Sequence, residues 1–286
     1  MIGMMGKDGM ERRRHARRAP TSMMRGFYVV ARETTRALPR DTSGRSRPAR
    51  VESTAVSRLI LAPLRRLAHR VWAWRILESV SRPDPCRLMG LDLVILPGVL
   101  HPKHFKSSRL LGRYVAALPL AGRRVADLGT GSGLLGLLAA RSGGTVTALD
   151  INPLAIACAR ANAERNGLHD RMKVCLSDGF DGAPEGERYD LIVTNPPFYP
   201  RAVDGLADHA FAAGDGHAFM SRLAAAIDLR LAAGGEIVMI HSSDTDFAPV
   251  EAMMEARGLT AATVSVHRGL FETLTIRAFR REAPAR

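Results

Sequence analysis

Residues 124–150 read RVADLGTGSGLLGLLAARSGGTVTALD. The stretch opens with RVADLGT (124–130), an apolar segment with the length and composition of a buried β-strand. After three closely spaced glycines, LLGLLAAR (134–141) is helical in character, and TVTALD (145–150) is a second strand. A strand, a helix and a strand in so short a stretch predict a right-handed β-α-β unit, whose two strands lie parallel in one sheet.

The alternation of strands and helices continues along the chain. The elements expected after residue 150 are helix 153–166, strand 173–178, strand 189–195, helix 216–233 closed by Gly234 and Gly235, and strand 236–242. Two final strands, 260–268 and 272–279, are joined by a linker too short for a crossover, so they must pair antiparallel. We therefore predict an α/β fold with a doubly wound, mostly parallel, seven-stranded Rossmann-like sheet whose last strand is antiparallel.

The formal net charge of +13 is concentrated in the first quarter of the chain. Residues 1–75 hold 18 of the 41 Lys and Arg residues but only 5 of the 28 Asp and Glu residues. Residues 1–52 lack apolar periodicity and are predicted to form a disordered basic arm. Such an arm could bind nucleic acid, act as a targeting peptide, or have no function if it is translated upstream sequence.

Apolar residues recur at helical spacing between Ser53 and Val80, with arginines between them. They predict one or two amphipathic helices, and we assign 53–97 to a small helical N-terminal extension and 98–282 to the main domain. No segment approaches the roughly 20 apolar residues that span a bilayer, and three widely separated cysteines are typical of reduced core residues. We expect a soluble, cytoplasmic protein without a membrane partner or a metal site.

Polar residues follow four of the expected strands. They are Asp127 with the glycine loop Gly129, Gly131 and Gly133, then Asp150, Asp178 and Asn195. In a doubly wound sheet, ligands bind beyond the carboxyl ends of the strands, near the switch in strand order. The glycines allow a ligand to approach the backbone and the N-terminus of the next helix. This edge of the sheet is the predicted cofactor site.

Two cofactors fit this arrangement. GSGLLG at 131–136 has the form of a dinucleotide-binding loop, and Asp150 stands where such a fold holds ribose hydroxyls. Asp127, however, places a carboxylate directly before the glycines, where it would repel a pyrophosphate. S-Adenosyl-L-methionine carries a sulfonium and an ammonium group and no phosphate, so it suits this position better.

The stretch TNPPFYP (194–200) predicts a stiff turn directly after a strand. Each proline lacks an N–H donor and holds the residue before it extended. The side chain of Asn195 and the carbonyl of Pro196 could then accept both hydrogens of an –NH2 group, and Phe198 could stack on the planar group that carries it. The alternative is an ordinary turn that leaves a strand.

DLGTGSG, ALDINPLAIACARANAERNG, SDGF and TNPPF, in this order and spacing, resemble motifs of class I S-adenosylmethionine-dependent methyltransferases, specifically the HemK-like small methyltransferase domain. The resemblance covers about residues 91–280. The resemblance implies that the methionine part of the cofactor lies against Gly129, Gly131 and Gly133, with Asp127 and Asn195 close by. It also implies that Asp150 binds the ribose hydroxyls and that Asp178 binds the adenine amine.

The resemblance further implies an N-methyltransferase, with Asn195 and Pro196 as acceptors for the target nitrogen and Phe198 as its stacking partner. The family more often has Tyr at this last position, and Phe is also seen in rRNA guanine-N2 methyltransferases of the same domain family. A protein glutamine is the first choice of substrate, and an exocyclic amine in RNA or DNA is the alternative, although residues 76–286 carry no net charge. A small-molecule amine, an NAD-dependent oxidoreductase and a silent binding domain are the remaining possibilities.

Overall fold

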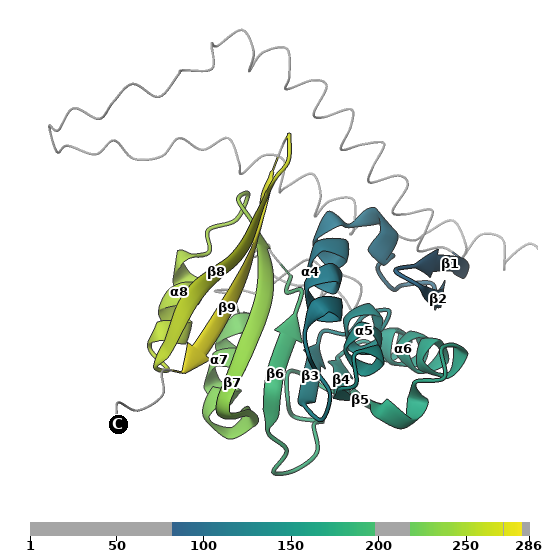
Figure 1. The fold of residues 1–286 in the computed structure, drawn as a ribbon, viewed down its shortest axis with the longest axis horizontal. Coiled ribbons are helices and arrows are strands. Elements are labelled where there is room, and N and C mark those ends of the chain that lie inside the picture. Colours follow the sequence, from purple (N-terminus) through teal and green to yellow (C-terminus); the bar gives the residue numbers. More distant parts are fainter. Residues whose placement is uncertain (1–81, 198–217, 271, 282–286) are drawn as a thin grey trace, which may run out of the picture. The chain divides into compact units, whose positions relative to one another are not determined.

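The computed structural model describes residues 82–197, 218–270 and 272–281. The strands of its main sheet are β3 (Arg124–Leu128), β4 (Thr145–Asp150), β5 (Met172–Leu176), β6 (Tyr189–Thr194), β7 (Leu231–Ser242), β8 (Leu259–Arg268) and β9 (Thr273–Arg281). They lie in the order β5-β4-β3-β6-β7-β9-β8 (Figure 1). Within this described sheet, only the pairs that β9 makes, with β7 and β8, are antiparallel. The predicted doubly wound, mostly parallel seven-stranded sheet is therefore confirmed.

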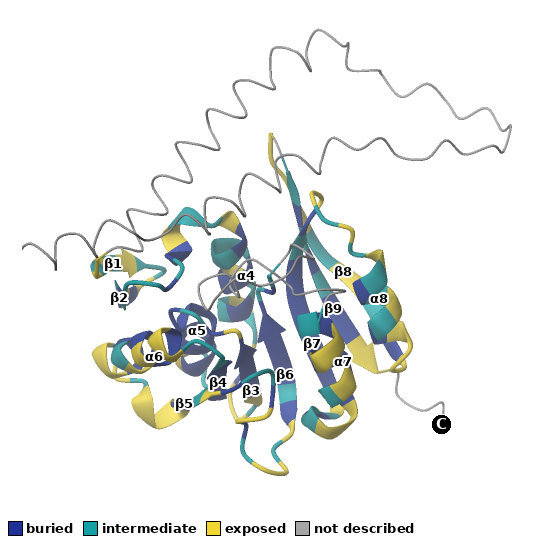
Figure 2. Cartoon of the chain, turned by 180° about the vertical axis from the view of Figure 1, so that it is seen from behind, coloured by how far each residue is buried: buried dark blue, intermediate teal, exposed yellow. Residues whose placement is uncertain are grey.

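Helices cover both faces of this sheet. One apolar core lies under α4 (Lys106–Ala117), α5 (Leu134–Arg141) and α6 (Pro153–Arg165), and a second lies under α7 (Ala218–Arg230) and α8 (Ala248–Glu255). Short 3-10 turns, η1 (Pro102–His104) and η2 (His169–Arg171), precede α4 and β5. The central strands are buried while the outer helix faces are exposed (Figure 2), which explains why these strands are continuous apolar runs. None of the described helices is long and apolar enough to cross a bilayer.

The order of the strands reverses between β3 and β6. From β3 the chain adds β4 and β5 toward one edge, whereas β6 and β7 lie on the other side. Leu128 at the end of β3 pairs with Leu149 of β4 and with Thr194 of β6. The loops that follow these three strands therefore leave the sheet side by side, at the switch point where open α/β sheets bind ligands.

The predicted boundary between α7 and β7 is wrong. The helix ends at Arg230 rather than at residue 233, and the strand begins at Leu231. Gly234 and Gly235, expected to close the helix, instead lie within β7, where Gly234 has a φ of +69°. A Cβ at Gly235 would lie 2.9 Å from the carbonyl oxygen of Tyr189, so this glycine allows the backbone to pass close to β6.

The described part of the expected helical extension is also not helical. Residues 84–95 form an antiparallel hairpin of β1 (Asp84–Leu88) and β2 (Leu91–Ile95). In β2 the buried Leu91, Leu93 and Ile95 alternate with the exposed Asp92 and the half-buried Val94, the period of a strand with one covered face. The helices expected between Ser53 and Val80, and the arm expected at 1–52, lie outside the described residues, so the domain boundaries stay predictions. The three cysteines are free, but only Cys158 is fully buried.

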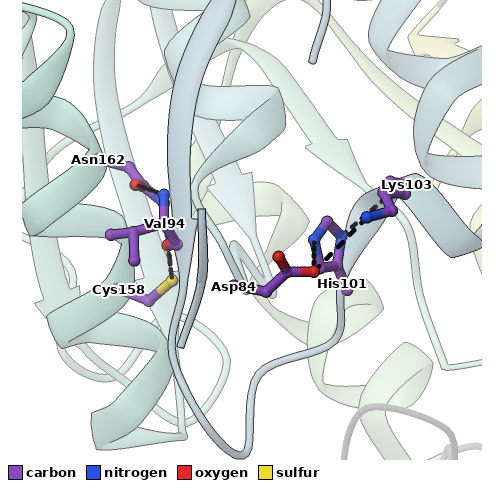
Figure 3. A network of polar contacts seen from close by, with 6 residues as sticks. All are labelled: Asp84, Val94, His101, Lys103, Cys158 and Asn162. Carbon is purple, nitrogen blue, oxygen red and sulfur yellow. Dashed lines mark hydrogen bonds and ion pairs between the residues drawn. The ribbon is translucent and has the colours of Figure 1, made fainter. Parts of the chain in front are cut away.

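A buried asparagine holds this hairpin on α6 (Figure 3). Asn162 Oδ1 accepts the N–H of Val94 at 2.7 Å, and its Nδ2 donates to the carbonyl of Val94 at 3.0 Å. The same Nδ2 donates to the carbonyl of Ser132, in the glycine loop, at 2.9 Å. Cys158 Sγ also lies 3.2 Å from the Val94 oxygen. One amide thus joins the hairpin to the predicted cofactor loop.

His101, the first residue of HPKH (101–104), links the start of the hairpin to η1. His101 is buried, its Nε2 lies 3.1 Å from Asp84 Oδ2, and its Nδ1 accepts the N–H of Lys103 at 3.2 Å (Figure 3). Burial lowers the pKa of His101 to about 4, in spite of the opposing effect of the Asp84 charge. The ring is therefore neutral near pH 7. It contacts Asp84 at the start of β1 and Lys103 in η1, and so links the hairpin to this turn.

We predict that Asn162→Ala lowers the free energy of unfolding by about 2–4 kcal/mol, because it leaves the backbone groups of Val94 and Ser132 without their hydrogen-bond partner. Asn166 is a matched control, since its amide binds the backbone N–H and carbonyl of Asp92 at 3.0 and 2.9 Å but is not fully buried. Asn166→Ala should cost about 1 kcal/mol. Urea unfolding measures both, and equal losses would contradict the role of burial.

Candidate functional site

The loop between β3 and α5 turns at three glycines with positive φ. The values are +75° at Gly129, +54° at Gly131 and +85° at Gly133. A Cβ at Gly129 or Gly131 would meet nothing within 4 Å, whereas one at Gly133 would lie 3.2 Å from the Cα of Ala159. The first two glycines therefore present bare backbone to open space, and the third allows the start of α5 to pack on α6.

Asp127 supports this loop from within the protein. Its side chain is fully buried, and Oδ2 accepts hydrogen bonds from Thr130 Oγ1 at 2.6 Å and from the N–H of Gly136 at 2.8 Å. Oδ1 is buried too, but accepts no hydrogen bond from a described residue. Burial raises the pKa of Asp127 to about 6, and the charge of Asp150 adds to the rise while the two hydrogen bonds oppose it. One oxygen fixes the loop and the other remains an acceptor.

Asp150 ends β4 beside the same loop. Its Oδ2 accepts the N–H of Gly131 at 2.8 Å, and its Oδ1 accepts the N–H of Asn152 at 2.9 Å. These bonds fix the carboxylate, and each carboxylate oxygen can accept further hydrogen bonds. Asp150 is therefore an oriented acceptor at the glycine loop.

Asp178 lies beyond the end of β5 and is less enclosed. It forms an ion pair with Arg222 of α7 through Oδ2, and its side chain is 43% exposed. No sequence pattern pointed to this partner. The pair fixes the carboxylate, and the solvent-facing part of Asp178 leaves room for a further donor such as an amine.

Asn195 follows the last residue of β6. Its Nδ2 donates to Ser107 Oγ at 3.4 Å and to Ser108 Oγ at 3.3 Å, both in the first turn of α4. Its Oδ1 is buried and has no partner among the described residues. Pro196 is buried, and Pro197 has no N–H to offer to nearby acceptors. Phe198, the predicted stacking residue, lies outside the described residues.

The residues of the site that sequence reasoning missed are those that hold the predicted ones in place. They are Thr130 and Gly136 beside Asp127, Ser107 and Ser108 beside Asn195, and Arg222 beside Asp178. Gly136 had a readable signal, because it completes the pattern GSGLLG; a Cβ there would lie 3.0 Å from Asp127 Oδ2. The serines had none, since they precede Asn195 by 87 and 88 residues.

These groups fit S-adenosylmethionine better than a dinucleotide. The buried Oδ1 of Asp127 is an acceptor without a donor among the described residues, which suits an ammonium group and would repel a phosphate. Open space beside Gly129 and Gly131 admits a ligand against the backbone. Asp150 and Asp178 add acceptors suited to ribose hydroxyls and to an adenine amine.

Comparison with known proteins agrees with this geometry. The profile of the family described as "Methyltransferase small domain" matches residues 90–265. A release factor glutamine methyltransferase of Bordetella pertussis is 37% identical over 170 residues, which cover 54% of this chain and 61% of that protein. A ribosomal protein L11 methyltransferase of Deinococcus radiodurans is 39% identical over 112 residues, or 37% of this chain and 40% of that protein.

A solved structure of similar fold is the T. thermophilus 16S rRNA N2 methyltransferase RsmC in complex with AdoMet and guanosine. Its sequence identity is 25% and its TM-score 0.53, with 70% of this chain and 50% of that chain covered. The chain thus spans less than two thirds of the length of each of these relatives. Because the family match covers more than half of the chain, the chain belongs to the methyltransferase small domain family, and its domain is a HemK-like, class I S-adenosylmethionine-dependent methyltransferase domain.

Proposed function

We propose that the protein is an N-methyltransferase that acts on a planar amide nitrogen, that of a protein glutamine side chain. The observation that carries this proposal is the buried Oδ1 of Asn195 at the end of β6, unpartnered within the described residues and next to the glycine loop that follows β3. A buried acceptor without a donor is rare in a folded protein, and it suits a site where a ligand brings the missing hydrogen. The carbonyl of Pro196 is the second acceptor for the same –NH2 group.

The residues on the cofactor side have separate tasks. Asp127 Oδ1 would accept from the ammonium group, the backbone of Gly129 and Gly131 would line the methionine part, and Asp150 and Asp178 would accept hydrogens of the ribose and the adenine. When bound, the cofactor would supply the methyl group of its sulfonium. The sulfur would keep the electron pair of the broken S–C bond and become a neutral thioether.

Asn195 and Pro196 supply the chemistry on the target side. An amide nitrogen is a weak nucleophile because its lone pair is delocalised into the carbonyl group. Two acceptors that bind its two hydrogens hold the nitrogen in place. They also favour its pyramidal form, in which the lone pair is no longer delocalised and is free to attack. Positioning reacting atoms about 3 Å apart can supply several kcal/mol of the barrier. The methylated nitrogen bears positive charge, so it can release its proton to water without a dedicated base.

The choice of a protein glutamine rests on the relatives. The Bordetella pertussis protein, which is 37% identical, is a release factor glutamine methyltransferase, and the Deinococcus radiodurans relative is a ribosomal protein L11 methyltransferase. Both relatives are therefore named for protein acceptors. The amide of a glutamine side chain is also planar and carries two hydrogens, which matches the two acceptors at Asn195 and Pro196.

An exocyclic base amine in RNA is a second candidate. Helix α4 contains three basic residues and no acidic one, and Lys106, Arg109 and Arg113 share its outer face, opposite the buried Leu111. Lys106 Nζ would lie 3.9 Å from a Cβ at Gly269, so this basic face reaches the turn between β8 and β9. Phosphates favour such a surface. The T. thermophilus neighbour, a 16S rRNA methyltransferase, agrees with this alternative.

We predict that the protein transfers label from tritiated S-adenosylmethionine into a lysate of its source cells, and that Asn195→Ala abolishes most of this transfer. Asn166→Ala, which changes an asparagine outside the site, should retain it. Protease should release the label if the acceptor is a protein glutamine. Release by ribonuclease instead would overturn the protein proposal in favour of RNA.

We also predict that the affinity for S-adenosylhomocysteine rises with pH and levels off above about pH 6. A raised pKa keeps the Asp127 carboxyl protonated at lower pH, so its negative charge, which attracts the ammonium group, is lost as the pH falls through this value. The dissociation constant should grow by up to about tenfold per pH unit below pH 6. Calorimetry between pH 5 and 7.5 measures this, and Asp127→Asn should remove the dependence. If Asp127→Asn kept the wild-type pH dependence, a group other than Asp127 would be responsible for it.

A further inference from the structure

We infer that Ser107 and Ser108, in the first turn of α4, are positioning residues that orient the Asn195 amide for its target. Nothing in the sequence links these serines to the TNPPF motif, and they reach it only through the fold. The inference rests on the proposed function, since it concerns how Asn195 holds the target –NH2 group.

The contacts around Asn195 divide its amide into two halves. Nδ2 lies 3.4 Å from Ser107 Oγ and 3.3 Å from Ser108 Oγ, so its two hydrogens face two hydroxyl oxygens. Oδ1, on the other side of the amide, is buried and has no partner among the described residues. The serines therefore occupy the donor half of the side chain and leave the acceptor half for a ligand.

This orientation decides whether the site can bind a target –NH2 group. If the amide turned by 180°, Nδ2 would face the target, and two N–H donors cannot hydrogen-bond each other. The turned amide would also bury an N–H group without an acceptor, and a buried donor without a partner is costly. A serine hydroxyl can donate as well as accept, so Ser107 and Ser108 could also bond a turned amide through Oδ1, and it is the buried N–H without an acceptor that counts against the turned orientation. In the observed orientation the serines accept from Nδ2 and leave Oδ1 to accept from the target.

The serines are themselves held on a rigid element. Ser107 is buried, and Leu111 and Val115, one and two turns further along α4, are fully buried in the core under α5. The α4 helix therefore cannot shift readily relative to the sheet. A hydroxyl fixed on a packed helix positions its partner better than one on a loop.

Three variants test the inference: Ser107→Ala, Ser108→Ala and the double variant. Ser108→Thr is the conservative variant, because it keeps the hydroxyl, and Ser221→Ala, on the exposed face of α7, is the matched control. The first readout needs no substrate. In 15N-labelled protein, the Asn195 side-chain amide signals, identified by their loss in Asn195→Ala, should shift in the alanine variants and keep their wild-type positions in Ser108→Thr and Ser221→Ala.

The second readout is transfer of methyl label into the same lysate acceptor. Each alanine variant should lower the transfer rate about tenfold, which corresponds to the loss of roughly one hydrogen bond. Ser108→Thr keeps the hydroxyl and should retain the wild-type rate. The affinity for S-adenosylhomocysteine should stay unchanged, because the serines act on the target side. A general loss of structure would instead weaken cofactor binding together with transfer.

Unchanged Asn195 amide signals in the double variant would overturn the inference, and so would a loss of cofactor affinity equal to the loss of rate. These outcomes are distinct from failure of the proposed function. If ribonuclease rather than protease releases the label, the substrate class is wrong. Even then, two measurements decide the role of the serines: whether the Asn195 amide signals shift, and whether the transfer rate falls while the affinity for S-adenosylhomocysteine is unchanged.

Discussion

The register of β3 with its two neighbours determines where the glycine loop, Asp150 and Asn195 lie. Leu128 pairs with Leu149 on one side and with Thr194 on the other. All three strands run parallel, so the residues that follow them emerge at one edge. The backbone pairing thus brings the glycine loop, Asp150 and Asn195 to one place, and a one-residue slip of β6 would turn its buried side chains to the opposite face.

Three buried side-chain oxygens at this edge have no hydrogen-bond partner in the described part of the chain: Asp127 Oδ1, Thr194 Oγ1 and Asn195 Oδ1. Each unsatisfied buried group costs about 1–3 kcal/mol, so a fold keeps such groups only where packing elsewhere offsets the loss. Here the two cores on either side of the sheet supply that packing. The other polar atom of the Asp127 and Asn195 side chains is hydrogen-bonded, at 2.6 and 2.8 Å for Asp127 Oδ2 and at 3.3 and 3.4 Å for Asn195 Nδ2, and these bonds set the direction of the unpartnered oxygen. The site is therefore organised before any ligand arrives.

The sheet and the cofactor loop could be predicted from the sequence because their signals are local. Apolar runs marked the strands, and Asp127 with its glycines marked the loop. The hairpin at 84–95 was missed because its short alternation follows a long stretch of helical spacing. The boundary at Arg230 was missed because Gly234 and Gly235 can either end a helix or allow two strands to approach closely, and a sequence does not distinguish these uses.

The partners of the site residues could not be predicted, for a different physical reason. Arg222 lies 44 residues from Asp178, and Ser108 lies 87 residues from Asn195. Contacts over such separations depend on how packed elements meet, and they leave no periodicity in either segment. The three acids and Asn195 were found as strand ends, whereas the side chains that orient them appear only in the folded chain.

The carboxyl edge of β3, β4 and β6 forms one site in this account, with the cofactor on the glycine loop and the target at Asn195. A crystal structure of the protein with S-adenosylhomocysteine tests this most directly. We expect the amino group of the ligand on Asp127 Oδ1, its ribose on Asp150, and its sulfur facing Asn195 Oδ1 across the space for the target nitrogen. A ligand bound elsewhere, or an Asn195 amide turned with Nδ2 toward the sulfur, would contradict it.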